Sequence, residues 1–362
     1  MSDEQSKISI KQLIIILLIA ISSPLIRVIP KNISTVAKDG SILTPLFIII
    51  PFLILIYVLN TLINKSGEKS LQDVYIKIFG KVLGKTILFF QAIWIFILLG
   101  VYIRYFADRF ASSILIFTPL YFFSSTLLVV TFIIVRNKLE YFARAIEVFS
   151  LLFSIIIGLL SLILLLYVDI HNIYPLTVFD ALDSLKSTPL LFGIVSYITY
   201  MFYLGEDISN KQDFKKYTKY LTSRVVLFSL FVTLATVGIF GYKLTGQFNL
   251  PFFMFLKNIK IFNFIERFES IFLSFWFVTD FTIVALLVYI LTRLIKKVTN
   301  IKYSKTTTTP IIFGAFIFSS YLVTSIFELY EFSQKFLLYI NIGFQFVLPI
   351  IALIVGKLRK MV

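Results

Sequence analysis

Few side chains in this sequence could support chemistry, and the clearest of them stands in apolar surroundings. Asp280 lies inside the run FLSFWFVTDFTIVALLVYI, directly after Thr279, and Glu266 and Arg267 precede the run. A carboxylate in such a segment is unfavourable unless a partner or water stabilises it. Asp280 and Thr279 are therefore a candidate site for a cation, a proton or a ligand ammonium group, with Glu266 and Arg267 as charges at the outer mouth. The alternative is that Asp280 pairs with a basic residue or backbone donors of a neighbouring helix.

A second candidate lies near the start of the chain, where the apolar run IIILLIAISSPLIRVIP is interrupted by Ser22, Ser23 and Pro24. An unwound turn inside a membrane frees backbone groups that hydrocarbon cannot satisfy. Such a turn is expected where it lines a cavity or contacts a ligand. A simple proline kink is the alternative.

Several classes of chemistry lack their residues. The sequence contains no cysteine and one histidine, His171, which lies in a polar connector. Thiolate metal sites and cysteine nucleophiles are therefore excluded. His171 is expected to be a solvated loop residue, so a Ser-His-Asp triad is not expected either. We predict no enzyme, no cofactor and no metal site.

Composition indicates that the helices carrying these residues lie in a membrane. Of 362 residues, 59% are hydrophobic and 15% charged, and mean hydropathy is +0.94, unlike a soluble domain. Windows of about 19 residues indicate ten membrane-spanning helices, and no signal peptide is expected to be cleaved before the first. The predicted spans are 11–29, 42–63, 87–109, 114–135, 145–168, 189–205, 221–241, 263–292, 310–328 and 335–356.

Basic residues predict the orientation of these spans. With the N-terminus inside, every cytoplasmic segment carries Lys or Arg, so both termini are expected in the cytoplasm. The formal net charge of +15 is distributed between apolar runs and forms no single patch, which argues against nucleic acid as a partner. The basic and aromatic segment KQDFKKYTKY (211–220) is expected to contact anionic membrane lipid or a cytoplasmic partner.

Ten spans divide into five and five within a single membrane domain, 1–362. The expected repeats are 11–168 and 189–356, and an odd number of spans inverts the second repeat relative to the first. The sequence thus predicts an all-α integral membrane protein with a 5+5 inverted-repeat transporter fold and broken helices 1 and 6.

The two predicted breaks are expected to face each other and to form a ligand site. Helix ends at such breaks expose partial charges suited to the carboxylate and ammonium of an amino acid. Packing of small residues between helices is the alternative for span 6. The ligand-binding candidates are Ser22, Ser23, Pro24, Gly193, Ser196, Tyr197, Thr199 and Tyr200.

Three charged residues lie near the end of the third predicted span. Arg104, Asp108 and Arg109 lie at its predicted outer end. Charged side chains at span ends are normally placed at the membrane interface. We interpret the three as an outer-interface charge cluster.

Motifs spread along the chain resemble one family. The most specific is NLPFFMFLKNIKIFNFIERFESIFLSFWFV (249–278), in which Glu266-Arg267 is followed by Phe275-Trp276. Further matches are ISIKQLIIIL (8–17), GKVLGK (80–85), TP (118–119), LEYFARAIEVFSLL (139–152) and NIYPL (172–176). Together they resemble the GerAB-like B subunits of spore nutrient germinant receptors, the spore germination permeases.

The resemblance implies a ten-helix fold of the amino acid/polyamine/organocation superfamily, located in the spore inner membrane. It further implies a complex with a larger A-type membrane subunit and a C-type lipoprotein, in which the B subunit binds a small-molecule germinant. Related sequences tend to have glycine at the break of helix 1, where this chain has Ser22-Ser23-Pro24.

Two other classes remain open from the sequence alone. A proton-coupled amino acid permease would use Asp280 as its coupling carboxylate. A multi-spanning membrane enzyme is disfavoured, because the loops contain no paired carboxylates or metal motif.

Overall fold

The computed structural model describes residues 7–113, 117–174, 176–259, 268–300 and 307–362, and in these ranges the protein is helical. The only β-type pairing there is an isolated bridge between Ile8 and Ile208. The elements of the first half are α1 (Ile10–Ala37), η1 (Lys38–Leu43), α2 (Thr44–Phe47), α3 (Ile49–Ser66), α4 (Leu71–Phe79), α5 (Lys81–Ser113), α6 (Leu120–Val135), α7 (Leu139–Leu164) and η2 (Ile170–Asn172).

The second half contains more short segments, including 3-10 turns and two π-helical turns, η6 and η7. Its elements are α8 (Val178–Val195), α9 (Ile198–Met201), η3 (Phe202–Asp207), η4 (Lys211–Tyr217), α10 (Thr218–Leu234), α11 (Val237–Gln247), α12 (Pro251–Asn258), α13 (Phe268–Thr299), α14 (Thr308–Tyr321), α15 (Ile326–Phe332), η6 (Ser333–Leu337), α16 (Leu338–Ile342), η7 (Gly343–Val347) and α17 (Leu348–Leu358).

The helices are long and apolar enough for an integral membrane protein. Six helical segments of the described residues meet this criterion, and a seventh is formed if α10 and α11, bent by 74°, count as one span. Helix α5 alone has 33 residues, about 50 Å of helix against a hydrocarbon core of about 30 Å. The ten-span count and the inverted repeat stay predictions.

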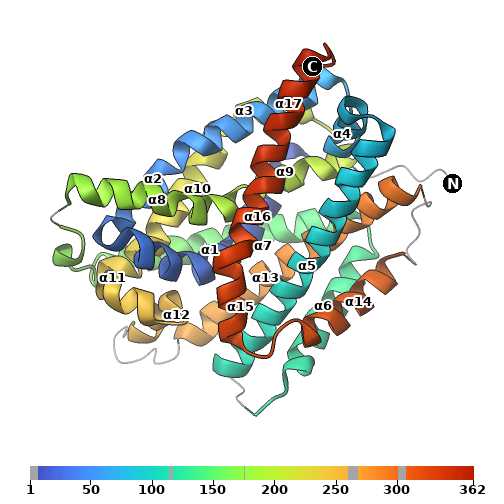
Figure 1. Ribbon diagram of the computed structural model, residues 1–362. Helices are drawn as coiled ribbons and strands as arrows, with labels where there is room; N and C mark the ends of the chain where they lie inside the picture. Colours follow the sequence, from blue (N-terminus) through green and yellow to red (C-terminus); the bar gives the residue numbers. More distant parts are fainter. Residues whose placement is uncertain (1–6, 114–116, 175, 260–267, 301–306) are drawn as a thin grey trace.

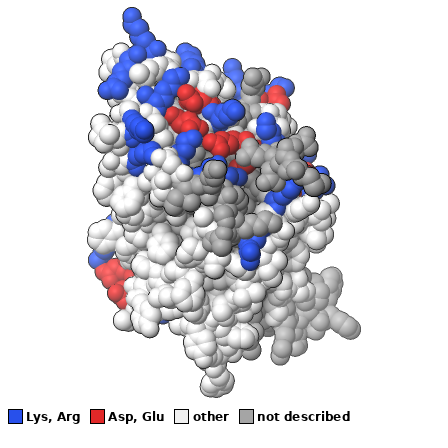
Figure 2. All heavy atoms as spheres, turned by 90° about the vertical axis from the view of Figure 1, so that its right-hand side faces the viewer, with Lys and Arg blue, Asp and Glu red and all other residues white. Residues whose placement is uncertain are grey.

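Charged side chains are concentrated toward one end of the bundle. Figure 2 shows most of the Lys, Arg, Asp and Glu gathered in the upper part of one face above a broad area without charge, with a smaller charged group at the lower left edge. The C-terminus lies at the same upper end (Figure 1). An uncharged belt below a charged end is the surface expected of a chain that lies in lipid.

Helix α1 is the central element and contacts α8, α13, α11, α7 and α10. It begins with a capping box, in which the Ser9 hydroxyl accepts from the Gln12 N–H and the Gln12 side chain accepts from the Ser9 N–H. Nearly all of its residues are buried, so its polar side chains must find partners inside the protein.

The predicted break in helix 1 is wrong, because α1 continues as one α-helix through Ser22, Ser23 and Pro24. The prolines at 24 and 30 each remove one backbone donor. Neighbouring helices surround this region, and packed neighbours allow proline inside a membrane helix. The segment is therefore a proline-containing helix rather than an unwound turn.

Span 6 begins as α8 and loses regular α-helical structure in its second half. A capping box of Thr177 and Asp180 starts the helix. After Val195 the chain forms a turn at Ser196 and Tyr197, the short helix α9 and the 3-10 segment η3. Of the predicted positions, Ser196 and Tyr197 lie at this change of helix type and Gly193 lies before it in α8. The segment Val178–Asp207 is long enough to form one membrane span, and a break in helix 6 stays a prediction.

Candidate functional site

The core of the candidate site is Asp280 of α13 with residues from α1 and α5. Arg109 and Ser23 both donate to its carboxylate, and a terminal nitrogen of Arg27 lies 3.9 Å from the same group. The indole N–H of Trp276 donates to the Ser23 hydroxyl at 3.1 Å. Asp280 and Ser23 are 0% exposed, Arg27 1% and Arg109 3%. These five residues, the buried ion cluster, tie the three longest helices of the interior together.

Aromatic rings cover both guanidinium groups. The Arg27 guanidinium lies 3.9 Å from the ring centre of Tyr105 and 5.4 Å from that of Tyr102, and that of Arg109 lies 4.1 Å from the Trp276 ring. Such cation–π contacts contribute up to about 2 kcal/mol each when desolvated. A charge near the bilayer centre costs about 2.5–3.5 kcal/mol or more. The rings therefore offset a substantial share of the cost of burying two cations.

The cluster corrects the interpretation of the third span. Arg109 is not an outer-interface charge, because α5 directs it to Asp280 in the interior. Arg104 and Asp108 instead pair with each other at 2.9 Å. Of the two interpretations of Asp280, the structure shows the ion-paired one.

Arg27 is not among the candidate residues predicted from the sequence, although its spacing in α1 carries a signal. It lies four residues after Ser23 in α1, and residues four apart share a helix face. On α5, Tyr102, Tyr105 and Arg109 are spaced by three and four and share a face for the same reason. The helix-face spacing would have found these partners.

Tyrosine hydroxyl groups connect the turn in span 6 to the buried ion cluster. The Tyr197 hydroxyl lies 2.8 Å from that of Tyr102 and accepts from Asn341 at 3.0 Å. Asn341 in turn accepts from the indole of Trp94 at 2.8 Å. Because Tyr102 lies against Arg27, these hydrogen bonds connect span 6 and α16 to the charged residues.

The π-helical turns of the last span also face this region. Ser333 of η6 lies 2.7 Å from the Tyr105 hydroxyl, and the backbone carbonyl of Gln345 in η7 accepts from Thr199 at 2.6 Å. π-Helical turns are frequent at functional sites. A cavity of about 10 Å³ beside Arg27 is lined by Tyr102, Tyr105 and Ser333, among others.

The remaining predicted residues of span 6 have structural contacts. A Cβ on Gly193 would lie 2.6 Å from the Leu338 carbonyl oxygen, so this glycine permits close packing of α8 on α16. Ser196 donates back to the Gly193 carbonyl at 3.2 Å. Tyr200 is buried and its hydroxyl has no hydrogen-bond partner among the described residues.

The other predicted positions lie on α13 or just before it. Thr279 donates to the carbonyl of Trp276 at 2.8 Å and is not among the residues that contact the carboxylate of Asp280. Glu266 and Arg267, the predicted outer-mouth charges, lie outside the described residues.

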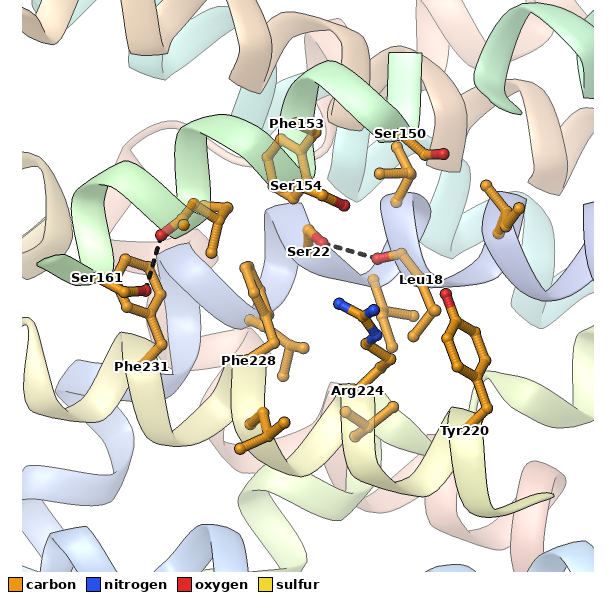
Figure 3. Close-up of a pocket in the computed structure, with 18 residues that line it drawn as sticks. Leu18, Ser22, Ser150, Phe153, Ser154, Ser161, Tyr220, Arg224, Phe228 and Phe231 are labelled. Carbon is orange, nitrogen blue, oxygen red and sulfur yellow. Dashed lines mark hydrogen bonds between the residues drawn. The ribbon is translucent and has the colours of Figure 1, made fainter. Parts of the chain in front are cut away.

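Ser22 faces a different space from Ser23. Figure 3 shows a pocket between α1, α7 and α10, with a volume of about 290 Å³ and Ser22 and Leu18 on the α1 wall. Ser22 donates to the Leu18 carbonyl at 2.7 Å. Arg224 extends from α10 toward α1 in this view, and the rest of the lining consists of aliphatic and aromatic side chains with serines of α7.

A row of tyrosines leads from the site toward the charged end. Tyr197, Tyr200 and Tyr203 recur every third residue, and their ring centres lie 5.2 and 6.1 Å apart. Beyond them, Asp207 pairs with Arg293 of α13 at 2.8 Å. Span 6 is therefore bonded at two levels to helices of the cluster.

These features define a polytopic membrane protein with ionised residues buried among its central helices, which is an arrangement typical of transporters and of receptors related to them. A family model described as spore germination protein matches residues 7–327. The chain belongs to this family.

A curated relative agrees with this assignment. It is described as "Putative spore germination protein YfkT" of Bacillus subtilis (strain 168) and is 24% identical to the chain over 230 residues. The matched region covers 63% of this chain and 62% of the relative. The chain thus spans less than two thirds of the length of that relative.

Proposed function

We propose that the protein is the germinant-binding transmembrane subunit of a spore germination receptor. It senses a small nutrient such as an amino acid and signals to partner subunits. The observation that carries the proposal is the buried ion cluster, in which Ser23, Arg27 and Arg109 surround Asp280. Tyr102 connects this cluster to the turn at Tyr197, because its ring lies against Arg27 and its hydroxyl lies within hydrogen-bond distance of the Tyr197 hydroxyl. Buried ionised groups of this kind mark ligand or ion pathways in membrane proteins.

Signalling follows from a difference in affinity between two arrangements of the bundle. A ligand that binds better when Tyr197 and Ser196 have moved away from α5 shifts the population toward that arrangement. A ligand with equal affinity for both arrangements shifts nothing. In the resting structure the cavity at Arg27 measures about 10 Å³, about the volume of one water molecule, so nutrient binding requires movement.

The charged end is the proposed site of contact with partners. We place both termini on the cytoplasmic side of the spore inner membrane, which is the spore core side. The Asp207–Arg293 pair and the pairs of Lys297 with Asp73 and Glu206 connect span 6, α13 and α4 there. An A-type membrane subunit that contacts this end would sense a shift of span 6, with a C-type lipoprotein as the third subunit.

A proton-coupled amino acid permease is the second candidate, and the buried carboxylate of Asp280 is the observation that favours it. In that mechanism Asp280 takes up and releases a proton during transport. Arg109 donates to Asp280, and a neighbouring cation favours the ionised carboxylate, which argues against a protonating role. The receptor therefore stands first.

Spores that carry Ser23→Ala or Asp280→Asn in place of the wild-type chain test the proposal. We expect the nutrient concentration for half-maximal germination to shift at least tenfold, measured by loss of optical density at equal protein abundance. Lys335→Gln is the control, because Lys335 pairs with Glu331 on the surface. Unchanged concentration dependence in both site variants would contradict the proposal.

Deletion and vesicle uptake separate the two candidates. A receptor predicts germinant-specific loss of germination with normal uptake in vegetative cells. A permease predicts accumulation of substrate in vesicles that collapses when the proton gradient is dissipated.

A further inference from the structure

The charges in the buried ion cluster do not balance. Among the residues that the structure describes, two guanidinium groups, those of Arg27 and Arg109, meet one carboxylate, that of Asp280. Arg104 and Asp108 on the same stretch of α5 already neutralise each other. The cluster therefore carries an excess of one positive charge in the interior of the bundle.

Hydrogen-bond donors are also left over in the cluster. Among the described residues, the Nε and one terminal nitrogen of Arg27, and the same two atoms of Arg109, are buried without a hydrogen-bond partner. Buried donors without an acceptor are rare in folded proteins and call for a ligand, a water or an ion. Here the four nitrogens belong to permanently charged groups, so the missing acceptor is best supplied by an anion.

A small cavity lies beside Arg27; the surface that it exposes is apolar, and Arg109 is not among the residues that line it. The cavity of about 10 Å³ is lined by Tyr105 and Ser333, whose hydroxyls lie 2.7 Å apart, and by Tyr102. Its volume accommodates one particle about the size of a water molecule. The remaining lining is largely apolar, including Val28 and Leu337, which excludes bulk water and strengthens a charge–charge contact.

We propose that Arg27 and Arg109 form a binding site for a monovalent anion, with Asp280 as an internal carboxylate that competes for the same donors. The anion is either a small halide or the carboxylate of the nutrient, and the carboxylate enters only in the arrangement in which the bundle has moved to enlarge the cavity of about 10 Å³. For the carboxylate, the inference deepens the proposed function and rests on it. For the halide, it stands alone.

The proposal assigns Asp280 a role opposite to that in a cation or proton site. Neutralising Asp280 raises the excess charge and frees the donor of Arg109, so anion binding tightens. In a cation or proton site the same change removes the binding group. Asp280→Asn therefore separates the two interpretations by the direction of its effect.

The test uses the full-length protein, purified in detergent, and its thermal unfolding at constant ionic strength. Sodium chloride or sodium acetate replaces sodium gluconate, whose bulky anion does not fit the cavity, and acetamide is the neutral counterpart of acetate. An anion that binds the folded state raises the unfolding temperature in a saturable way. The variants are Arg27→Gln, Arg109→Gln and Asp280→Asn, with Arg104→Gln as the matched control on α5.

We expect chloride, acetate or both to stabilise the wild type, while acetamide does not. The apparent affinity should fall at least tenfold in Arg27→Gln and in Arg109→Gln, stay within twofold in Arg104→Gln, and rise at least fivefold in Asp280→Asn. A halide response alone identifies an inorganic anion, and an acetate response identifies the carboxylate class.

A second measurement uses the wild type alone, in case a variant does not fold. Trp276, one of two tryptophans in the chain, lies against Arg109. Iodide that enters the site quenches its fluorescence, and chloride or acetate reduces this quenching by competition. Wild-type protein without any anion response in both measurements overturns the inference, as does loss of the response in Asp280→Asn.

Failure of this inference is distinguishable from failure of the proposed function. If deletion abolishes germination while the Arg27→Gln and Arg109→Gln spores respond normally, the function stands and the anion site is wrong. If the purified protein binds anions but deletion leaves germination unchanged, the anion site stands and the receptor role is wrong.

Discussion

Ser22 and Ser23 are adjacent in α1, but they face two different regions of the molecule. Ser23 belongs to the buried ion cluster, where its hydroxyl donates to Asp280 and accepts from Trp276. Ser22 bonds to its own helix and lines a pocket of about 290 Å³ between α7 and α10. The first region is tightly closed and charged, whereas the second is open and largely apolar (Figure 3).

The difference teaches that the size of a cavity is a poor guide to function in this fold. The large pocket is lined mostly by apolar side chains, and its serines Ser150 and Ser161 donate to carbonyls of their own helix. The small cavity beside Arg27 touches groups whose charges and donors are incompletely matched. The proposed site is therefore assigned from unmatched charges and hydrogen-bond donors and not from cavity volume.

The largest effect is expected from Asp280→Ala. The change leaves Arg27 and Arg109 without a carboxylate, and breaking a buried pair on one side costs about 3–5 kcal/mol. Thermal unfolding in detergent measures the loss. The double variant Glu331→Ala/Lys335→Ala, which removes an exposed pair, should change stability by less than about 1 kcal/mol. Equal effects of the two would remove the contrast between the buried and exposed charges.

Gly193→Ala should have the next largest effect. Its new methyl group would lie 2.6 Å from the Leu338 carbonyl oxygen, so α8 and α16 must separate, at about 1–3 kcal/mol. Because Asn341 on α16 contacts Tyr197, the nutrient response should weaken too. Stability equal to that of the wild type would show that the close contact is not needed.

Ser23→Ala tests the face of α1 that contacts the buried ion cluster. It removes one donor to Asp280 and the acceptor of the Trp276 indole, which we expect to destabilise the protein by about 1–2 kcal/mol. Chemical unfolding checks the value. A neutral result would mean that the two arginines, Arg109 and Arg27, are sufficient to hold Asp280.

The sequence was sufficient to predict a helical membrane protein and to identify Asp280 as a carboxylate inside an apolar span, since a lone carboxylate in an apolar run is visible without any structure. The partners of Asp280 were harder to find. Arg109 stands near the end of its helix, a position normally taken by interface charges, and only the packing of α5 on α13 shows that it points inward.

The break in helix 1 failed as a prediction for a related physical reason. A proline after two serines is compatible with both an unwound turn and a continuous helix, and the neighbouring helices decide between them. In span 6 the loss of α-helix after Val195 agrees with the polar positions in the sequence. There, Gly193 serves packing on α16, a contact between distant segments that local sequence does not specify.

In the pocket between α1, α7 and α10, Gly158→Ala should stabilise the protein slightly. Nothing in the part of the chain that the structure describes lies within 4 Å of the position of a new Cβ, and alanine favours helix over glycine by about 0.5–1 kcal/mol. The dose response to nutrient should be unchanged. A shifted response at equal abundance would indicate that the pocket takes part in sensing and would weaken the contrast with the ion cluster.

Ser22→Ala is the smallest change and the matched partner of Ser23→Ala. The lost hydrogen bond runs to Leu18 of the same helix, and serine bonds to the carbonyl four residues back slightly destabilise helices. Alanine should therefore alter stability by less than about 0.5 kcal/mol and leave the nutrient response unchanged. Both quantities are measured on the same preparations as for Ser23→Ala. If Ser22→Ala reduced the response as strongly as Ser23→Ala, the two faces of α1 would act as one site, and the division between them would be wrong.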